Sequence, residues 1–226
     1  MTVHQATSPA PAASGERDAG LIVERSGAVV RLRLNRPQRA NALSAPLVDA
    51  LTAAVATASG DGTRLLVLEG EGASFCSGFD LSDIDTQSDG DLALRFIRIE
   101  LMLQAVYHAP MPTMALAQGR VFGAGADLFG ACSVRIAAPD AKFRFPGPGF
   151  GLILGTGRLG RCIREYAAQN WLLSGREVDA ASALDVGFAS EIFEPGRWPA
   201  RIAELGEGGP LASSTIAAVL GRPEGR

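Results

Sequence analysis

Residues 112–137 read PTMALAQGRVFGAGADLFGACSVRIA, and this stretch predicts the architecture of the chain. Its apolar start, Pro112 to Ala117, is typical of a strand. A glycine-rich turn over Gly119 to Gly125 leads into a short helix, Asp127 to Cys132, and Val134 to Ala137 predicts the next strand. Strands that alternate with helices in this way indicate an α/β fold with mostly parallel pairing.

The same alternation extends toward the N-terminus. The first two predicted strands surround a turn at Ser26-Gly27, and in the second of them the apolar residues alternate with Arg31 and Arg33. Ser44 can cap the helix that follows. The predicted elements are strands at Leu21 to Glu24, Ala28 to Leu34 and Arg64 to Leu68, and helices at Ser44 to Ser59 and Asp91 to His108.

Toward the C-terminus the pattern predicts helices at Leu159 to Leu173 and Ala180 to Val186 and a last strand at Phe188 to Phe193. Two short helices, Trp198 to Leu205 and Ser213 to Leu220, follow. Residues 1–20 are rich in Ala, Ser and Pro and have no apolar signal segment, so they predict a disordered leader. The expected organisation is therefore leader 1–20, core 21–195 and a C-terminal helical segment 196–226.

Composition excludes several classes of protein. The 226 residues are 47% hydrophobic and 20% charged, with a net charge of −3, which predicts a globular protein without the basic surface of a nucleic-acid binder. No apolar run reaches the roughly 18–20 residues of a membrane helix. Three separated Cys and two His, none at ligand spacing, predict buried thiols in a reducing cytoplasm and no metal site.

One glycine motif, Gly155 to Gly160, matches the GxGxxG fingerprint of dinucleotide-binding proteins. Acidic residues follow about twenty positions later, at Glu177 and Asp179, but they begin a predicted helix and do not end a second strand. We therefore favour close packing or a bend as the role of these glycines, and a nucleotide-binding oxidoreductase is the weaker alternative.

Two further loops, Ser74 to Leu81 and Gln118 to Leu128, each follow a predicted strand and offer small side chains. Two accessible backbone N–H groups that converge on one oxygen form an oxyanion hole, although glycine-rich loops also serve simply as turns. Asp127, at the start of a helix, can cap that helix, take part in chemistry, or do both.

An ordered set of motifs over about Leu21 to Phe193 resembles one family. The motifs are Asn35-Arg36-Pro37, Asn41-Ala42-Leu43-Ser44, Phe75 to Leu81, Gly123 to Leu128, Arg135 to Ala138 with Phe143, Arg158-Leu159-Gly160, Leu173 to Arg176 and Gly187-Phe188-Ala189. The chain is similar to the crotonase, or enoyl-CoA hydratase/isomerase, superfamily.

The resemblance implies a spiral of ββα units, here with a shortened C-terminal helical tail, that binds an acyl-CoA thioester. It implies that the backbone N–H groups of Phe79 and Ala124 form the oxyanion hole. It also implies a homo-oligomer, a trimer or hexamer, and no cofactor apart from the coenzyme A of the substrate. The residues implied to bind CoA are Gln38, Arg39, Ala40, Ala42, Ser77, Gly78, Asp80 and Leu81.

The departures from the family pattern concern the two glutamates that a hydratase uses to move protons. Asp127 stands at the first position and Gly147 at the second, so only one carboxylate remains. Ordinary surface or capping roles are expected for the other acids considered, Asp80, Glu100 and Glu165. The sequence thus favours an acyl-CoA-processing enzyme with a non-standard reaction, and a non-catalytic acyl-CoA-binding or accessory protein is the alternative.

Overall fold

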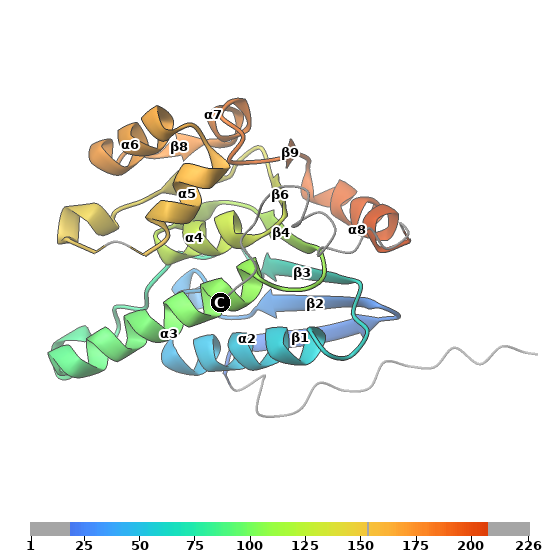
Figure 1. Cartoon of the computed structure of the whole chain (residues 1–226), viewed down its shortest axis with the longest axis horizontal. Helices are drawn as coiled ribbons and strands as arrows, with labels where there is room; N and C mark the ends of the chain where they lie inside the picture. The colour runs from blue at the N-terminus through green and yellow to red at the C-terminus, as the bar shows by residue number, and fades with distance from the viewer. Residues whose placement is uncertain (1–18, 153, 208–226) are drawn as a thin grey trace, which may run out of the picture.

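A six-stranded sheet forms the centre of the computed structural model, which describes residues 19–152 and 154–207 (Figure 1). The strand order is β1-β2-β3-β4-β6-β9; β1 and β2 are antiparallel and the other pairs are parallel. The strands are β1 Leu21–Ser26, β2 Val29–Leu34, β3 Leu65–Gly70, β4 Thr113–Ala117, β6 Val134–Ala137 and β9 Glu191–Ile192. The predicted α/β class with mostly parallel pairing is confirmed. The predictions for residues 1–18 and for a helix at Ser213 to Leu220 lie outside the described residues.

A second, three-stranded sheet contains β5 Arg120–Phe122, β7 Lys142–Arg144 and β8 Val178–Asp179. The strand β5 lies inside the region predicted as a turn, so that prediction is wrong over these three residues. Val121 is fully buried and pairs with Phe143. Strands this short contain too few residues for an alternating pattern to reveal them.

The helices are α2 Ala45–Ala58, α3 Asp89–Tyr107, α4 Ala124–Ala131, α5 Thr156–Cys162, α6 Glu165–Ser174, α7 Ala180–Asp185 and α8 Trp198–Glu207. The helix α3 starts with a capping box, in which the Ser88 hydroxyl accepts a hydrogen bond from the Asp91 N–H and the Asp91 carboxylate accepts one from the Ser88 N–H. In the described residues, no helix is long and apolar enough to span a membrane.

Two predicted helix boundaries are wrong. The single helix predicted at Leu159 to Leu173 is two helices, because Ile163 and Arg164 both adopt extended backbone conformations and the Ile163 side chain turns into the core. The helix predicted to begin at Asp127 begins at Ala124, because Gly123, with a φ of 52°, provides the N-cap. Asp127 therefore lies one turn inside α4.

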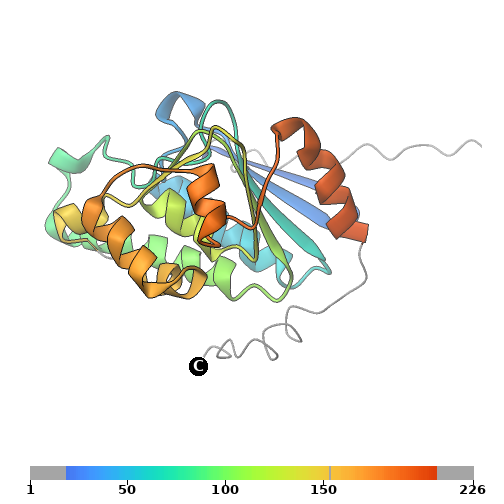
Figure 2. The same ribbon diagram turned by 90° about the horizontal axis from the view of Figure 1, so that it is seen from above.

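The two faces of the main sheet are covered by different helices. Alternate residues of β2, β3 and β4, such as Leu32, Leu66 and Ala115, point toward the core formed with α2, α3 and α4. The intervening residues of β3, β4 and β6 contact Trp198 and Ile202 of α8. Figure 2 shows α8, in red, on the opposite side of the sheet from the other helices.

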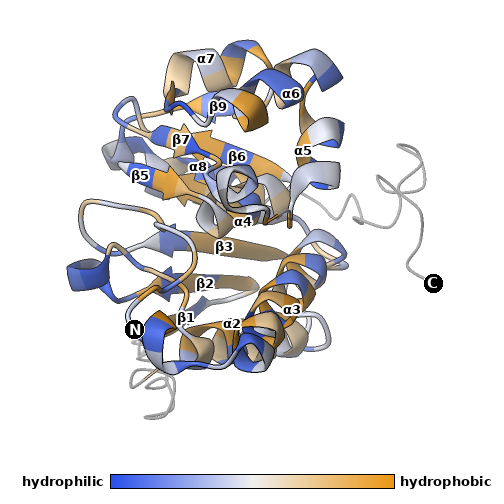
Figure 3. Ribbon diagram, turned by 90° about the vertical axis from the view of Figure 1, so that its left-hand side faces the viewer, coloured by the Kyte–Doolittle hydropathy of each residue, from blue (hydrophilic) through white to orange (hydrophobic). Residues whose placement is uncertain are grey.

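The outer face of the sheet is divided into an apolar half and a charged half. Val29 and Val67 belong to the apolar cluster under α8, whereas Arg31, Arg33 and Glu69, further along the same strands, form ion pairs. The Glu69 carboxylate lies 2.8 Å from Arg31 Nη2 and 2.9 Å from Arg33 Nε. Figure 3 shows β2 and β3 changing from hydrophobic to hydrophilic toward their C-terminal ends.

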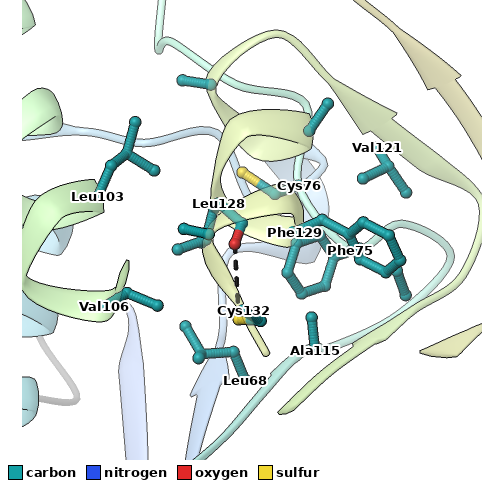
Figure 4. Packing of buried hydrophobic residues seen from close by; sticks show 14 of the residues in the cluster. Leu68, Phe75, Cys76, Leu103, Val106, Ala115, Val121, Leu128, Phe129 and Cys132 are labelled. Atoms are coloured by element: carbon teal, nitrogen blue, oxygen red, sulfur yellow. Dashed lines mark hydrogen bonds between the residues drawn. The ribbon is translucent and has the colours of Figure 1, made fainter. Parts of the chain in front are cut away.

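The main core lies between the sheet and α4. Phe75 and Phe129 pack edge to face with ring centroids 6.4 Å apart, and Cys76 and Cys132 lie in the same cluster (Figure 4). Burial raises the pKa of both thiols to about 12, so they stay protonated. The prediction of buried cysteines is confirmed for these two, and Cys162 is partly exposed.

Candidate active site

The loop after β3 contacts the N-terminus of α4 through Gly78. This glycine has a φ of +92°, and a Cβ atom there would lie 2.6 Å from the Phe122 carbonyl oxygen and 3.2 Å from the Ala124 nitrogen. Only glycine permits both this conformation and this approach. The chain therefore brings the two predicted oxyanion segments into backbone contact.

The N–H groups of Phe79 and Ala124 both lie beside this contact. Phe79 forms a parallel bridge with Leu43, in which Leu43 N–H donates to Gly78 O (2.7 Å) and Asp80 N–H donates to Leu43 O (3.4 Å). In such a bridge the N–H of the central residue points away from its partner. Ala124 is the first residue of α4, where an N–H has no acceptor within the helix.

Two consecutive residues of α3 hold the Phe79 side chain. The Phe96 ring stacks on the Phe79 ring, with centroids 4.5 Å apart and an angle of 19° between the planes. The Arg95 guanidinium lies 4.1 Å from the centroid of the Phe79 ring, and its Nη2 donates to the Asp80 carbonyl oxygen at 2.7 Å. These contacts position the peptide that carries the Phe79 N–H.

Asp80 is buried, and its carboxylate stabilises the loop. Arg36 Nη1 donates to Asp80 Oδ2 at 2.7 Å and to the Ala42 carbonyl oxygen at 2.6 Å, while the Ser82 N–H and hydroxyl donate to Asp80 Oδ1. Burial opposes ionisation of Asp80, but the hydrogen bonds from Ser82 and Arg36 outweigh it and lower the pKa to about 2. A role of Asp80 in CoA binding stays a prediction.

Asn41 connects the two segments that are predicted to bind CoA. Its fully buried side chain accepts from the Arg36 N–H and donates to the carbonyl oxygens of Glu71 and Ser74 at 2.9 and 2.8 Å. The Ser77 N–H donates to the Ala40 carbonyl oxygen at 2.9 Å. Residues 38–42 and 77–81 therefore lie side by side, and Gln38, Arg39 and Leu81 are exposed. Their contact with CoA remains a prediction.

Asp127 lies one helical turn after Ala124, on the same side of α4. Its side chain does not cap the helix, so the capping interpretation is wrong. The carboxyl group instead packs against Gly155, where any added Cβ atom would overlap its Oδ1 atom. Close packing by Gly155 is thereby confirmed.

The surroundings of Asp127 change its acidity. Burial raises its pKa, the positive charge of Arg158 lowers it, the negative charge of Glu100 raises it again, and a hydrogen bond with the Gly155 backbone lowers it. The net result is a pKa of about 7, against an ordinary value of 3.8. A carboxyl group that changes protonation near neutral pH is a candidate for proton transfer.

The pairing of Glu100 with Arg158 is the feature of the site that the sequence does not reveal. The expected surface role of Glu100 is wrong: its two carboxylate oxygens accept from Arg158 Nη1 and Nη2 at 2.8 and 2.5 Å. The pair joins α3 to α5 beside Asp127. No motif links residues this far apart in the chain, so only the tertiary structure shows the arrangement.

Gly147 has no room for a side chain. It begins the 3-10 helix η3 Gly147–Phe150, and a Cβ atom there would lie 2.7 Å from the Leu152 carbonyl oxygen. The Leu152 N–H also donates to the Gly147 carbonyl oxygen at 2.9 Å. The backbone of this turn therefore occupies the position where a second acid would begin.

The GxGxxG match at Gly155 lacks the structural context of a dinucleotide site. Leu152 and Leu154, which precede it among the described residues, lie outside any strand. Gly155 immediately precedes α5 and faces the Asp127 carboxyl group. The arrangement does not support the nucleotide-binding alternative, whose fingerprint requires a strand before the glycine turn.

The candidate site thus consists of two loop segments in backbone contact at Gly78 and one buried carboxyl group, that of Asp127. Residues 24–206 match the family model described as Enoyl-CoA hydratase/isomerase. The chain belongs to the enoyl-CoA hydratase/isomerase family, the crotonase superfamily.

Individual similar proteins are described as members of the same family. A probable enoyl-CoA hydratase from Mycobacterium bovis is 35% identical over 204 residues, covering 88% of this chain and 81% of its own length. A probable enoyl-CoA hydratase from Rhodobacter capsulatus is 35% identical over 193 residues, which cover 82% of this chain and 74% of that protein's own length. A solved structure from Bordetella parapertussis, described as an enoyl-CoA hydratase/isomerase, has a TM-score of 0.85 and 44% identity and covers 90% of this chain and 85% of its own.

Proposed function

We propose that the protein binds an acyl-CoA thioester and transfers a proton at the carbon next to the thioester carbonyl, with Asp127 as its single acid–base group. The observation that carries this proposal is the contact of Gly78 with Phe122 and Ala124. It supports two backbone N–H groups, those of Phe79 and Ala124, acting together on one carbonyl oxygen, one helical turn from the Asp127 carboxyl group.

The chemistry follows from where charge develops. When the carbon beside a thioester carbonyl loses a proton, or when a carboxylate on that carbon leaves as CO2, the electron pair of the broken bond stays behind and negative charge moves to the carbonyl oxygen as an enolate. Two N–H donors aimed at that oxygen, with the N-terminus of α4 behind one of them, stabilise the charge. Protonated Asp127 can donate a proton to the enolate carbon, and ionised Asp127 can remove one. A pKa of about 7 makes both forms available at neutral pH.

The absence of a side chain at Gly147 argues against the standard hydration reaction. Addition of water needs one group to activate the water and another to protonate carbon, unless a single group does both in turn. Decarboxylation of a malonyl-type thioester and an atypical hydration each require only one carboxyl group for proton transfer at this carbon. Hydrolysis is a different reaction at the same site: Asp127 would take a proton from a water that attacks the carbonyl carbon, and the two N–H groups would stabilise the tetrahedral intermediate. These are the reactions that we propose to test.

The test combines calorimetric titration with turnover of a panel of enoyl-, malonyl- and aryl-CoA thioesters. We expect micromolar to millimolar binding and turnover of at least one member, as is usual for enzymes. Asp127→Asn should leave binding within about threefold and reduce turnover by about 100-fold or more. Unchanged turnover in this variant would remove the proposed role of Asp127. Asp140→Asn, an exposed carboxylate outside the site, is the matched control.

A second candidate function is a non-catalytic acyl-CoA-binding or accessory protein, which the backbone contact at Gly147 favours. The same panel separates the two functions. Binding without turnover of any thioester supports the accessory function, and binding with turnover supports the enzyme. Absence of binding to every thioester contradicts both.

A further inference from the structure

An ion pair between the helices α3 and α5 lies near the Asp127 side chain. Glu100 of α3 and Arg158 of α5 meet through two parallel hydrogen bonds, so both terminal nitrogens of the guanidinium face one carboxylate. The helix α4, which carries Asp127, packs against both α3 and α5. The side chains of Arg158 and Glu100 are only 13% and 27% exposed.

Both members of this pair act on Asp127 with opposite signs. The described charged groups that influence its carboxyl group are Arg158, from α5, and Glu100, from α3, and the Gly155 backbone adds a hydrogen bond. Tyr107, at the end of α3, lies within electrostatic reach of Arg158. The pair as a whole has no net charge, so Asp127 faces a dipole and not an isolated cation.

Arg158 could also have paired with Asp127 itself. A guanidinium close to a buried carboxylate forms charge-assisted hydrogen bonds with it when its orientation permits. Here Glu100 accepts from Nη1 and Nη2, and Nε, which is buried, has no hydrogen-bond partner among the described residues. Without Glu100, Asp127 is the carboxylate that still acts electrostatically on Arg158, so the Arg158 side chain would turn toward it.

We propose that Glu100 is a positioning residue for Asp127: by holding the guanidinium of Arg158 through both terminal nitrogens it orients Arg158 away from a direct ion pair with Asp127, whose carboxyl group packs against Gly155 one turn before Arg158, and leaves that carboxyl group available for proton transfer. This inference rests on the proposed function for its catalytic meaning, but its physical content does not depend on turnover. The pKa of about 7 for Asp127 agrees with it, because a directly paired aspartate has a pKa below its ordinary value.

The test measures the protonation of Asp127 directly in the full-length protein. The side-chain carboxyl carbons of Asp are labelled with ¹³C and followed by NMR from pH 4 to pH 9, and Asp127→Asn identifies the Asp127 signal. The measured quantity is the titration midpoint of Asp127, the pH at which its signal has moved half-way between the protonated and ionised positions. In Glu100→Gln we expect this midpoint to fall by roughly one pH unit or more, because Arg158 becomes the counterion of Asp127. In Arg158→Gln, which leaves the Glu100 charge beside Asp127, we expect the midpoint to rise.

Two further variants make the result decisive. Glu100→Asp shortens the side chain by one methylene, so it should hold Arg158 less completely and give an intermediate fall. The double variant Glu100→Gln/Arg158→Gln removes both charges and should return the midpoint toward that of the unmodified protein. Glu165→Gln, which removes an exposed carboxylate at the start of α6, is the control and should leave the Asp127 midpoint unchanged.

An Asp127 midpoint that stays constant or rises in Glu100→Gln overturns the proposal, provided that circular dichroism shows an intact fold. If that variant does not fold, a constant or higher midpoint in Glu100→Asp overturns it instead. Failure of the proposed function looks different, because the NMR midpoints would shift as expected while no thioester is turned over. If the proposed function holds, the pH dependence of turnover moves in parallel with the NMR midpoint, which a merely structural role of Glu100 would not produce.

Discussion

The burial of Asp127 disfavours the ionised form of its carboxyl group. Its pKa of about 7 means that the folded protein retains a proton that the unfolded chain releases near pH 3.8. Between these values the folded state binds more protons than the unfolded state, so stability falls as the pH rises. The unfavourable contribution is complete above pH 7 and absent below about pH 3.8.

Asp127→Asn removes this contribution. We expect a higher free energy of unfolding for the variant at pH 8, by up to roughly 4 kcal/mol, and a gain that shrinks steadily toward pH 4. Urea denaturation at pH 4, 6 and 8 measures it. A gain of the same size at every pH would contradict the shifted pKa.

Gly155 and Gly157 provide a matched pair for testing the position of the Asp127 carboxyl group. Both lie at the start of α5, but a Cβ atom at Gly155 would overlap that carboxyl group, whereas in the described part of the chain no atom outside the helix's own backbone and the adjacent residues lies within 4 Å of one at Gly157. We expect Gly155→Ala to reduce turnover by about tenfold or more, and Gly157→Ala to preserve it while raising stability by about 0.5–1 kcal/mol. Equal turnover in the two variants would show that the position of Asp127 is not critical.

At the scale of elements, α3 supports the site at two points. Near its N-terminus, Arg95 and Phe96 hold the Phe79 ring, and one turn further on Glu100 holds Arg158. One helix therefore positions both the peptide proposed to bind the thioester oxygen and the surroundings of the proposed acid.

Phe96→Ala tests the first of these contacts. Loss of the stacked ring should let the Phe79 loop move and reduce turnover by about tenfold, with a smaller change in acyl-CoA affinity. Ile97→Ala, an exposed residue on the next position of the same helix, is the control and should behave like the unmodified protein. Steady-state kinetics on the thioester found in the panel measures both variants. A reduction of equal size in Ile97→Ala would point to a general weakening of α3.

Sequence patterns predict some helices and strands correctly and miss others. Long strands such as β2 and β3 have clear alternation or apolar runs, and the predicted bounds of β6, Val134–Ala137, are the observed ones. The break at Ile163 is not predictable, because an apolar residue in a helical pattern gives no sign that its backbone will be extended. Within the site, Asp127, Phe79 and Ala124 come from the family resemblance. Arg158 belongs to a motif of the resemblance, but its pairing with Glu100 could not be predicted, since that pairing depends on how α3, α4 and α5 pack.

At the scale of the whole molecule, the chain matches its family over most of its length and spans 81% and 74% of the lengths of the two relatives compared above. The resemblance predicts assembly as a trimer or hexamer. Light scattering should give a mass three or six times that of the 23.5 kDa chain. A mass equal to a single chain at micromolar concentration would contradict this prediction.

The division of the outer sheet face has a consequence for the choice of buffer. Chloride at high ionic strength screens the more exposed ion pairs of the charged half, those of Arg33 with Glu24 and Glu71, whereas sulfate, which is excluded from protein surfaces, also strengthens the apolar contacts under α8. We expect 1 M sodium chloride to lower the free energy of unfolding by up to about 1 kcal/mol, sodium sulfate of equal ionic strength to raise it, and Glu24→Gln, which removes an exposed partner of Arg33, to reduce the chloride response. Denaturation in the two salts measures this difference. Identical responses would contradict it. The two halves of one sheet face would thus give the protein opposite sensitivities along the Hofmeister series.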